Sequence, residues 1–279
     1  MIEPDLYRIR DFVPDFDAIA AEFSGRSRAL SARATIKADV AYGGRARETL
    51  DLIFPENPVA GAPLHVFVHG GYWRSGEKEN YRFVAEPVLA VGGVAALVEY
   101  DLMPGERLPV LVNQVRRAVL WLQDHAGDFG VDKARITVSG HSAGAHLASY
   151  LCAMAPAETS QPRLPRLAGM LLVSGIYDLS GIPDSFLKHE AKMTPGEASG
   201  WSPLRSVHHD GPKRIIAYGA DETRPFHEQA VALHATLSDA GKPVELLAVS
   251  SLNHMSVVLE LGDSECLLGQ RLAELTVAR

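Results

Sequence analysis

Gly140-His141-Ser142-Ala143-Gly144 is the stretch that decides the fold, because it joins a segment with the composition of a strand to one with the composition of a helix. The preceding residues 135–139 are mostly apolar or β-branched, and residues 145–154, which follow, are rich in alanine and helical in composition. A G-x-S-x-G pattern between a strand and a helix predicts a sharp turn that lifts the serine side chain clear of its own backbone. We therefore predict that Ser142 is a nucleophile at a strand-to-helix turn.

Apolar, strand-sized runs alternate with helical segments along most of the chain. This alternation predicts the α/β class: a doubly wound, mostly parallel sheet with helices on both faces. The loops at the carboxyl ends of such strands meet at one edge and form the site. The expected strands are residues 50–54, 64–68, 94–98, 135–139, 170–173, 215–218 and 244–249, and the expected helices are 16–23, 81–90, 110–125, 226–240 and 256–261.

Length and composition limit the classes of protein to consider. With 279 residues, 47% of them hydrophobic, the chain can bury one large core, so we expect a single domain over residues 1–279. Residues 1–41 are mixed in character and are expected to form an arm that packs on this domain or covers a site. The net charge of −7 and the scattered basic residues argue against nucleic-acid and membrane partners.

The chain has only two cysteines, Cys152 and Cys266. We therefore expect no disulfide framework, and this cysteine content favours a reducing cytoplasm. Because the first residues have no basic stretch followed by an apolar one, we expect no signal peptide, and no apolar run is long enough to predict a membrane span. The expected partner is a small-molecule substrate, and a homodimer is left open as the assembly.

A second motif, His69-Gly70-Gly71-Tyr72-Trp73, follows the expected strand 64–68. Paired glycines let backbone N–H groups face a cavity, so Gly70 and Gly71, together with the N–H of Ala143, are predicted to form an oxyanion hole. An ordinary glycine turn is the alternative. Tyr72 and Trp73 are candidates for the substrate pocket, although buried aromatic residues are often only part of a core. His69 is expected to brace this loop.

A nucleophilic serine needs a base to take its proton, and the G-x-S-x-G pattern is associated with a histidine on a late loop of the chain. His254 fits best, since it follows the last expected strand in residues 251–255. The acid should follow the strand 215–218, where Asp221 and Glu222 compete. Loop spacing favours Glu222, whereas aspartate is the commoner residue type in this role. We predict Glu222 and keep Asp221 as the alternative.

Together these motifs resemble the α/β-hydrolase fold, in its H-G-G esterase branch, and the H-G-G-Y-W box is similar to that of the kynurenine formamidase (arylformamidase) group. The resemblance implies a triad of Ser142, Glu222 and His254 with an oxyanion hole at Gly70 and Gly71. It implies hydrolysis of N-formyl-L-kynurenine or another aryl formamide. The resemblance also extends to residues 174–179, Ser202-Pro203, residues 226–229 and Asn253-His254.

Two alternatives stay open at this point. One is a carboxylesterase for short-chain or aryl esters, because related sequences include many esterases and pocket shape sets the substrate. The other is a non-catalytic binding module on a hydrolase scaffold, which the presence of both Ser142 and His254 disfavours. Neither a metal nor a cofactor is expected, since the chain has no H-E-x-x-H run and no Cys/His cluster.

Overall fold

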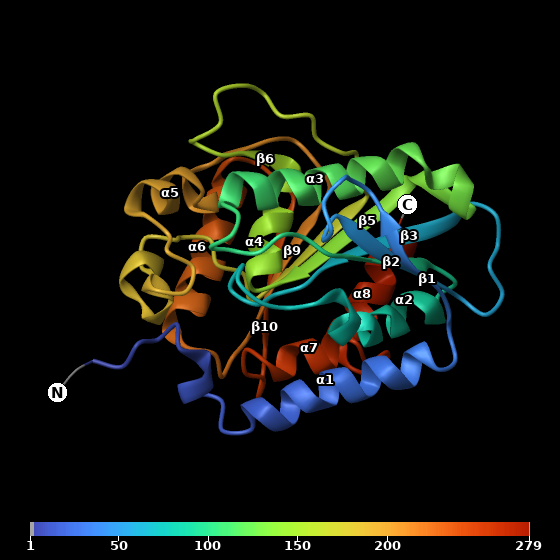
Figure 1. Cartoon of the computed structure of the whole chain (residues 1–279), viewed down its shortest axis with the longest axis horizontal. Coiled ribbons are helices and arrows are strands. Elements are labelled where there is room, and N and C mark those ends of the chain that lie inside the picture. The colour runs from blue at the N-terminus through green and yellow to red at the C-terminus, as the bar shows by residue number, and fades with distance from the viewer. Residues whose placement is uncertain (1–2, 279) are drawn as a thin grey trace.

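An eight-stranded sheet runs through the centre of the molecule, as Figure 1 shows for the computed structural model, which describes residues 3–278. The strand order is β1-β2-β4-β3-β5-β7-β9-β10. From β4 to β10 neighbouring strands are parallel, whereas β1 and β2 are antiparallel to their neighbours. The strands are β1 (Thr35–Ala41), β2 (Thr49–Phe54), β3 (Ala62–Val68), β4 (Val94–Val98), β5 (Val131–His141), β7 (Gly169–Val173), β9 (Arg214–Gly219) and β10 (Val244–Val249), with β6 (Ala153–Met154) and β8 (Val207–His208) paired separately.

Helices cover both faces of the sheet (Figure 1). One core cluster joins the sheet to α3, α4, α5 and α6, and the other joins it to α1, α2, α7 and α8. The helices are α1 (Phe16–Ser31), α2 (Glu86–Ala90), α3 (Leu108–Asp124), α4 (Ala143–Ser149), α5 (Pro195–Gly200), α6 (Arg224–Asp239), α7 (Ser256–Leu261) and α8 (Leu267–Val277).

Strand β3 shows why the central strands are mostly apolar. All of its residues are buried. Leu64 and Val66 belong to one core cluster, whereas Phe67 belongs to the cluster on the opposite face. Successive side chains of a strand point to opposite faces, so a strand covered on both sides needs apolar residues at nearly every position.

The expected α/β class is confirmed, and the structure changes some details. The expected helix at 81–90 is a 3₁₀ helix, η2 (Lys78–Ala85), followed by α2. Pro87 lies in the first turn of α2 and has no N–H to donate to a preceding turn, so the α-helical ladder starts there. Helix α1 runs eight residues beyond the expected end, and β1 and α8 were not expected. Within residues 3–278, no helix is both long and apolar enough to cross a bilayer.

The segment before α1 is attached by hydrogen bonds to α6 and to the residue that precedes it. The Thr223 hydroxyl donates to the Leu6 carbonyl at 2.7 Å, and the Gln229 amide donates to the Tyr7 hydroxyl at 2.9 Å. The chain then forms a 3₁₀ helix, η1 (Ile9–Asp11), and enters α1. These contacts hold the N-terminal segment beside the loop that carries the candidate acids.

Candidate active site

Ser142 lies at the junction of β5 and α4 with φ +55° and ψ −120°, a strained conformation for a residue with a side chain. Its N–H donates to the Val173 carbonyl at 2.9 Å, which ties the turn to β7. A Cβ on Gly140 would lie 2.5 Å from the Gly144 carbonyl oxygen, and one on Gly144 would lie 2.1 Å from the Val68 carbonyl oxygen. Both glycines of the motif are therefore needed for close backbone packing.

A line of hydrogen bonds connects Ser142 to His254 and Glu222. The Ser142 Oγ lies 3.0 Å from His254 Nε2, and His254 Nδ1 lies 2.7 Å from Glu222 Oε2. The other carboxylate oxygen, Oε1, accepts from the Gly219 N–H at 2.7 Å and from the Ser174 hydroxyl at 2.5 Å. Both carboxylate oxygens of Glu222 therefore have hydrogen-bond partners, which holds the side chain in place.

The two candidate acids lie in different surroundings. The Glu222 side chain is 0% exposed and contacts His254. Asp221 is exposed, and its backbone N–H donates to the Leu252 carbonyl at 2.9 Å. Of the two, the structure therefore brings Glu222 to the histidine and leaves Asp221 in solvent.

The loop after β3 lies directly against the serine. A Cβ on Gly70 would lie 3.2 Å from the Ser142 Cβ, and Gly71 has φ +117°. A Cβ on Gly71 would also lie only 2.1 Å from the Ser75 carbonyl oxygen. Among the hydrogen bonds of residues 3–278, none uses the N–H of Gly71 or of Ala143. These N–H groups can serve a ligand at the serine.

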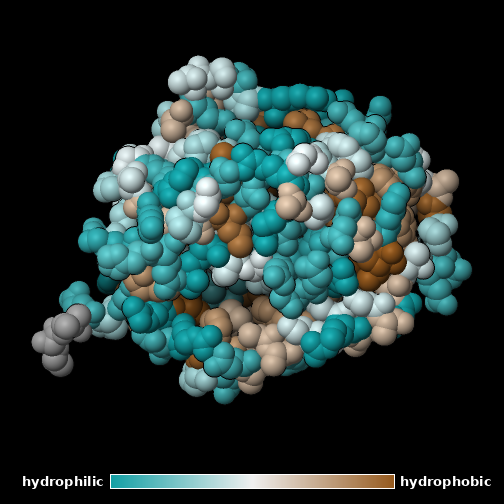
Figure 2. Space-filling view, viewed as in Figure 1, coloured by the Kyte–Doolittle hydropathy of each residue, from teal (hydrophilic) through white to brown (hydrophobic). Residues whose placement is uncertain are grey.

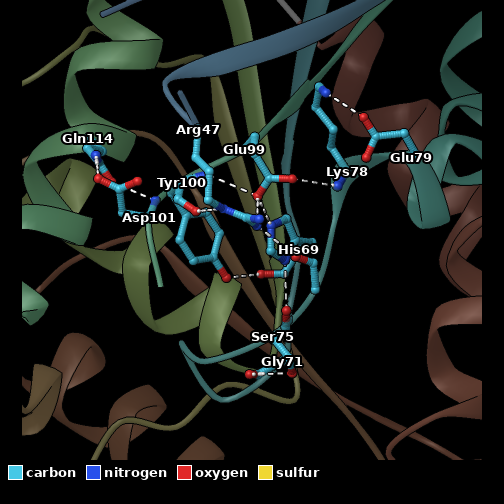
Figure 3. A network of polar contacts seen from close by, with 12 residues as sticks. Arg47, His69, Gly71, Ser75, Lys78, Glu79, Glu99, Tyr100, Asp101 and Gln114 are labelled. Carbon is cyan, nitrogen blue, oxygen red and sulfur yellow. Dashed lines mark hydrogen bonds and ion pairs between the residues drawn. The ribbon is translucent and has the colours of Figure 1, made fainter. Parts of the chain in front are cut away.

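His69 links this loop to a buried polar network, drawn in Figure 3. Its Nδ1 donates to the Gly70 carbonyl at 2.8 Å, and its Nε2 lies 2.8 Å from the Glu99 carboxylate. The ring is stacked between Tyr81 and Tyr100. Since the Gly70–Gly71 peptide is trans, holding its carbonyl toward His69 turns the Gly71 N–H the other way.

Glu99 receives donors from several directions. Arg47 Nη2 donates to Oε1 at 2.5 Å, and the Lys78 N–H donates to Oε2 at 3.0 Å. Burial raises the pKa of the Glu99 carboxyl, but the hydrogen bond from His69 and the charges of His69 and Arg47 outweigh burial and bring the pKa below its ordinary value. Both ring nitrogens of His69 thus face oxygen acceptors, which fixes the orientation of the ring.

Two contributors to the site were not foreseen from the sequence. The His141 ring packs on the His254 ring, with centroids 4.7 Å apart, and its Nε2 donates to the His254 carbonyl at 2.9 Å. Burial and the neighbouring His254 lower the pKa of His141 well below its ordinary value, so the ring is neutral. The second contributor is Ser174, whose position at the end of β7 was a usable signal, since strand ends form the site.

A cavity of about 440 Å³ opens above Ser142 and His254. The N-terminal segment and α1 form one wall, and Figure 2 shows this face hollowed above α1. Tyr72, one of the two candidates for the substrate pocket, lines the cavity. Trp73 corrects the expectation: its side chain is fully buried, its indole N–H donates to His146 at 3.0 Å, and it is not part of the cavity wall.

Among residues 3–278, the carboxylates of Asp39, Asp51 and Glu79 lie close enough together to hold a metal ion. The Lys78 ammonium already lies 2.7 Å from Asp39, 3.4 Å from Asp51 and 2.6 Å from Glu79. Arg82 also pairs with Asp51 at 2.6 Å. The cluster is compensated by these cations and is best described as an ion-pair network.

The arrangement defines the α/β-hydrolase class: a serine at the tip of a central strand, with a histidine and a carboxylate on later strand-end loops. Comparisons with known proteins agree. The chain resembles the crystal structure of a candidate thioesterase from Silicibacter sp. TM1040, with a TM-score of 0.81 and 25% identity over 97% of this chain and 98% of that one.

Sequence relatives narrow the class. The model of the BD-FAE family matches residues 50–237. The kynurenine formamidase of Danio rerio is 32% identical over 92% of this chain and 87% of its own length. Esterase LipQ of Mycobacterium tuberculosis is 28% identical over 73% of this chain and 53% of its own length. The chain therefore belongs to the BD-FAE family of α/β-hydrolase esterases, and its relatives support hydrolase activity of the esterase or formamidase kind.

Proposed function

We propose that the chain is a serine hydrolase that removes the formyl group from a small aryl formamide, such as N-formyl-L-kynurenine, through an acyl-enzyme. The observation that carries this proposal is the hydrogen-bonded line from Ser142 through His254 to Glu222 at the floor of the cavity. The identity shared with a kynurenine formamidase supports the formamide as substrate.

In the first step the Ser142 hydroxyl attacks the formyl carbon while its proton passes to His254 Nε2, 3.0 Å away. Glu222, 2.7 Å from Nδ1, holds the ring in the tautomer that can accept this proton and stabilises the imidazolium. The N–H groups of Gly71 and Ala143 donate to the oxyanion. Losing one such donor costs about 3 kcal/mol of transition-state stabilisation.

The tetrahedral intermediate then collapses with cleavage of the C–N bond. His254 gives its proton to the departing nitrogen, the arylamine leaves, and the formyl group stays on Ser142 as an ester. Water replaces the amine, loses a proton to His254 and attacks the ester carbon. Formate leaves, and Ser142 regains its proton from His254. No group outside the chain, the substrate and water is needed for this balance.

Replacing the nucleophile tests the proposal. Ser142→Ala is expected to lower kcat for formate release by about 10⁵-fold or more and to prevent labelling by a fluorophosphonate probe. Ser238→Ala, at an exposed position of α6, is the matched control and should keep both properties. Full formamidase activity in the Ser142→Ala variant would refute the mechanism.

A carboxylesterase is the second candidate, favoured by the likeness to esterase LipQ. The same machinery would cleave a C–O bond in place of the C–N bond. Values of kcat/KM for N-formyl-L-kynurenine and for p-nitrophenyl acetate separate the two. Turnover of the ester without any turnover of the formamide would select the carboxylesterase.

A further inference from the structure

The cavity above Ser142 is lined by positive charge only. Arg8, Arg10 and Arg74 are part of its wall, and within the described residues that wall contains no aspartate, glutamate or lysine. The chain as a whole carries 34 acidic and 27 basic residues, so this local excess runs against the overall composition. A cavity with charge of one sign attracts ligands of the opposite sign.

Two of these arginines converge on one aromatic ring. The guanidinium carbon of Arg8 lies 5.3 Å from the centroid of Phe186, and that of Arg74 lies 6.0 Å from it. Phe186 in turn packs edge-on against Tyr72, with centroids 5.5 Å apart. The N-terminal segment, the loop after β3 and the loop before α5 thus bring two cations to the same part of the cavity wall.

The two guanidinium groups still have donors to offer. Arg8 has only a long ion pair, 3.9 Å, with the half-exposed Asp11, and within the described residues its side chain makes no hydrogen bond. Arg74 Nε lies 2.6 Å from the Glu190 carboxylate without hydrogen-bond geometry, and within the described residues no guanidinium nitrogen of Arg74 makes a hydrogen bond. Arg10 differs, since its guanidinium donates to Asp17 at 2.6 Å and lies over Phe16.

We propose that Arg8 and Arg74 form a carboxylate subsite, so that the cavity selects aryl formamides or aryl esters whose leaving group carries a carboxylate. Arginine suits this role because its planar donors match the two oxygens of a carboxylate. The cavity volume of about 440 Å³ lies within the usual range for a small-molecule site. The subsite rests on the proposed function for its scissile bond, and its ligand chemistry can be tested separately.

The kinetic test uses matched substrates: phenyl acetate against 4-acetoxybenzoate, and formanilide against 4-formamidobenzoate. The measured quantity is the ratio of kcat/KM for the carboxylated substrate to that for the neutral one, compared between variants so that intrinsic reactivity cancels. We expect the Arg8→Gln, Arg74→Gln double variant to lower this ratio by roughly tenfold or more, mainly through a higher KM for the anion. The Arg8→Lys variant should retain part of the wild-type preference for the carboxylated substrate.

Arg28→Gln is the charge-matched control, since Arg28 is exposed in the last turn of α1 and is not part of the cavity wall. Its ratio should equal that of the wild type, and added NaCl should lower the wild-type preference. The subsite is refuted if the double variant keeps the wild-type ratio, or if Arg28→Gln lowers it equally.

A binding measurement separates this inference from the proposed function. Calorimetry with 4-hydroxybenzoate and with phenol needs no turnover. The wild type should bind the benzoate roughly tenfold more tightly than phenol, and the double variant should lose that difference. Equal binding of both compounds by the wild type would overturn the subsite even if formamides were hydrolysed. Preferential benzoate binding without any hydrolysis would overturn the proposed function alone.

Discussion

At the scale of single residues, geometry distinguishes the two adjacent carboxylates that could contact His254. Glu222 is buried against His254, and Asp221 is exposed. Glu222→Gln removes the negative charge that stabilises the imidazolium, so we expect kcat to fall by about 10³ to 10⁴-fold. Initial rates of formate release measure this loss.

The adjacent residue is the natural control for that variant. Asp221→Asn changes the same charge one position away without touching His254, and kcat should stay within about twofold of the wild type. If Asp221→Asn were the inactive protein and Glu222→Gln the active one, the observed contact between Glu222 and His254 would not be the catalytic one.

At the scale of elements, the loop after β3 needs glycine at position 71 for two reasons, a positive φ angle and a close backbone contact. Gly71 has φ +117°, and a Cβ there would lie 2.1 Å from the Ser75 carbonyl oxygen. Gly71→Ala must therefore displace the loop that carries a proposed oxyanion donor. We expect a kcat lower by about 10²-fold or more, together with a lower Tm. Kinetics and thermal unfolding of the same preparation measure both.

The Gly61→Ala variant is the control for Gly71→Ala, because it introduces backbone strain without a steric clash. Gly61 has φ +75°, but nothing lies within 4 Å of the Cβ that alanine would add. Gly61→Ala should therefore cost about 1 kcal/mol of stability without lowering kcat. A Gly71→Ala protein with normal kcat would show that the position of this loop does not control the reaction.

At the scale of the whole molecule, the features that can be predicted from the sequence are those set by hydrophobic periodicity and by position at the end of a strand. The fold class, the strands β4 and β10, and the turn at Ser142 follow from such local patterns. The direction of Trp73 does not, because it depends on the positive φ angles of Tyr72 and Trp73, which no apolar pattern records. Arg8 reaches the cavity only because distant hydrogen bonds hold the N-terminal segment beside α6.

Several histidines far apart in the sequence are buried as neutral rings in the folded chain. Burial lowers the pKa of His65 to about 3 and that of His146 to about 4, and it also lowers that of His141. Below pH 6.5 the unfolded chain binds protons on these rings and the native chain does not. The free energy of unfolding should therefore fall with decreasing pH, by about 1.4 kcal/mol per pH unit for each such histidine.

Urea unfolding between pH 7 and pH 5 measures this slope in a range where ordinary carboxyl groups stay ionised. His146→Gln removes one of the buried rings, which lies against Trp73 and donates from Nε2 to the Trp201 carbonyl. The variant should be less stable at pH 7 and should also show a shallower slope, by about one bound proton. His189→Gln, at an exposed position, should keep the wild-type slope. An unchanged slope in His146→Gln would mean that this ring takes up its proton equally in the native and the unfolded chain.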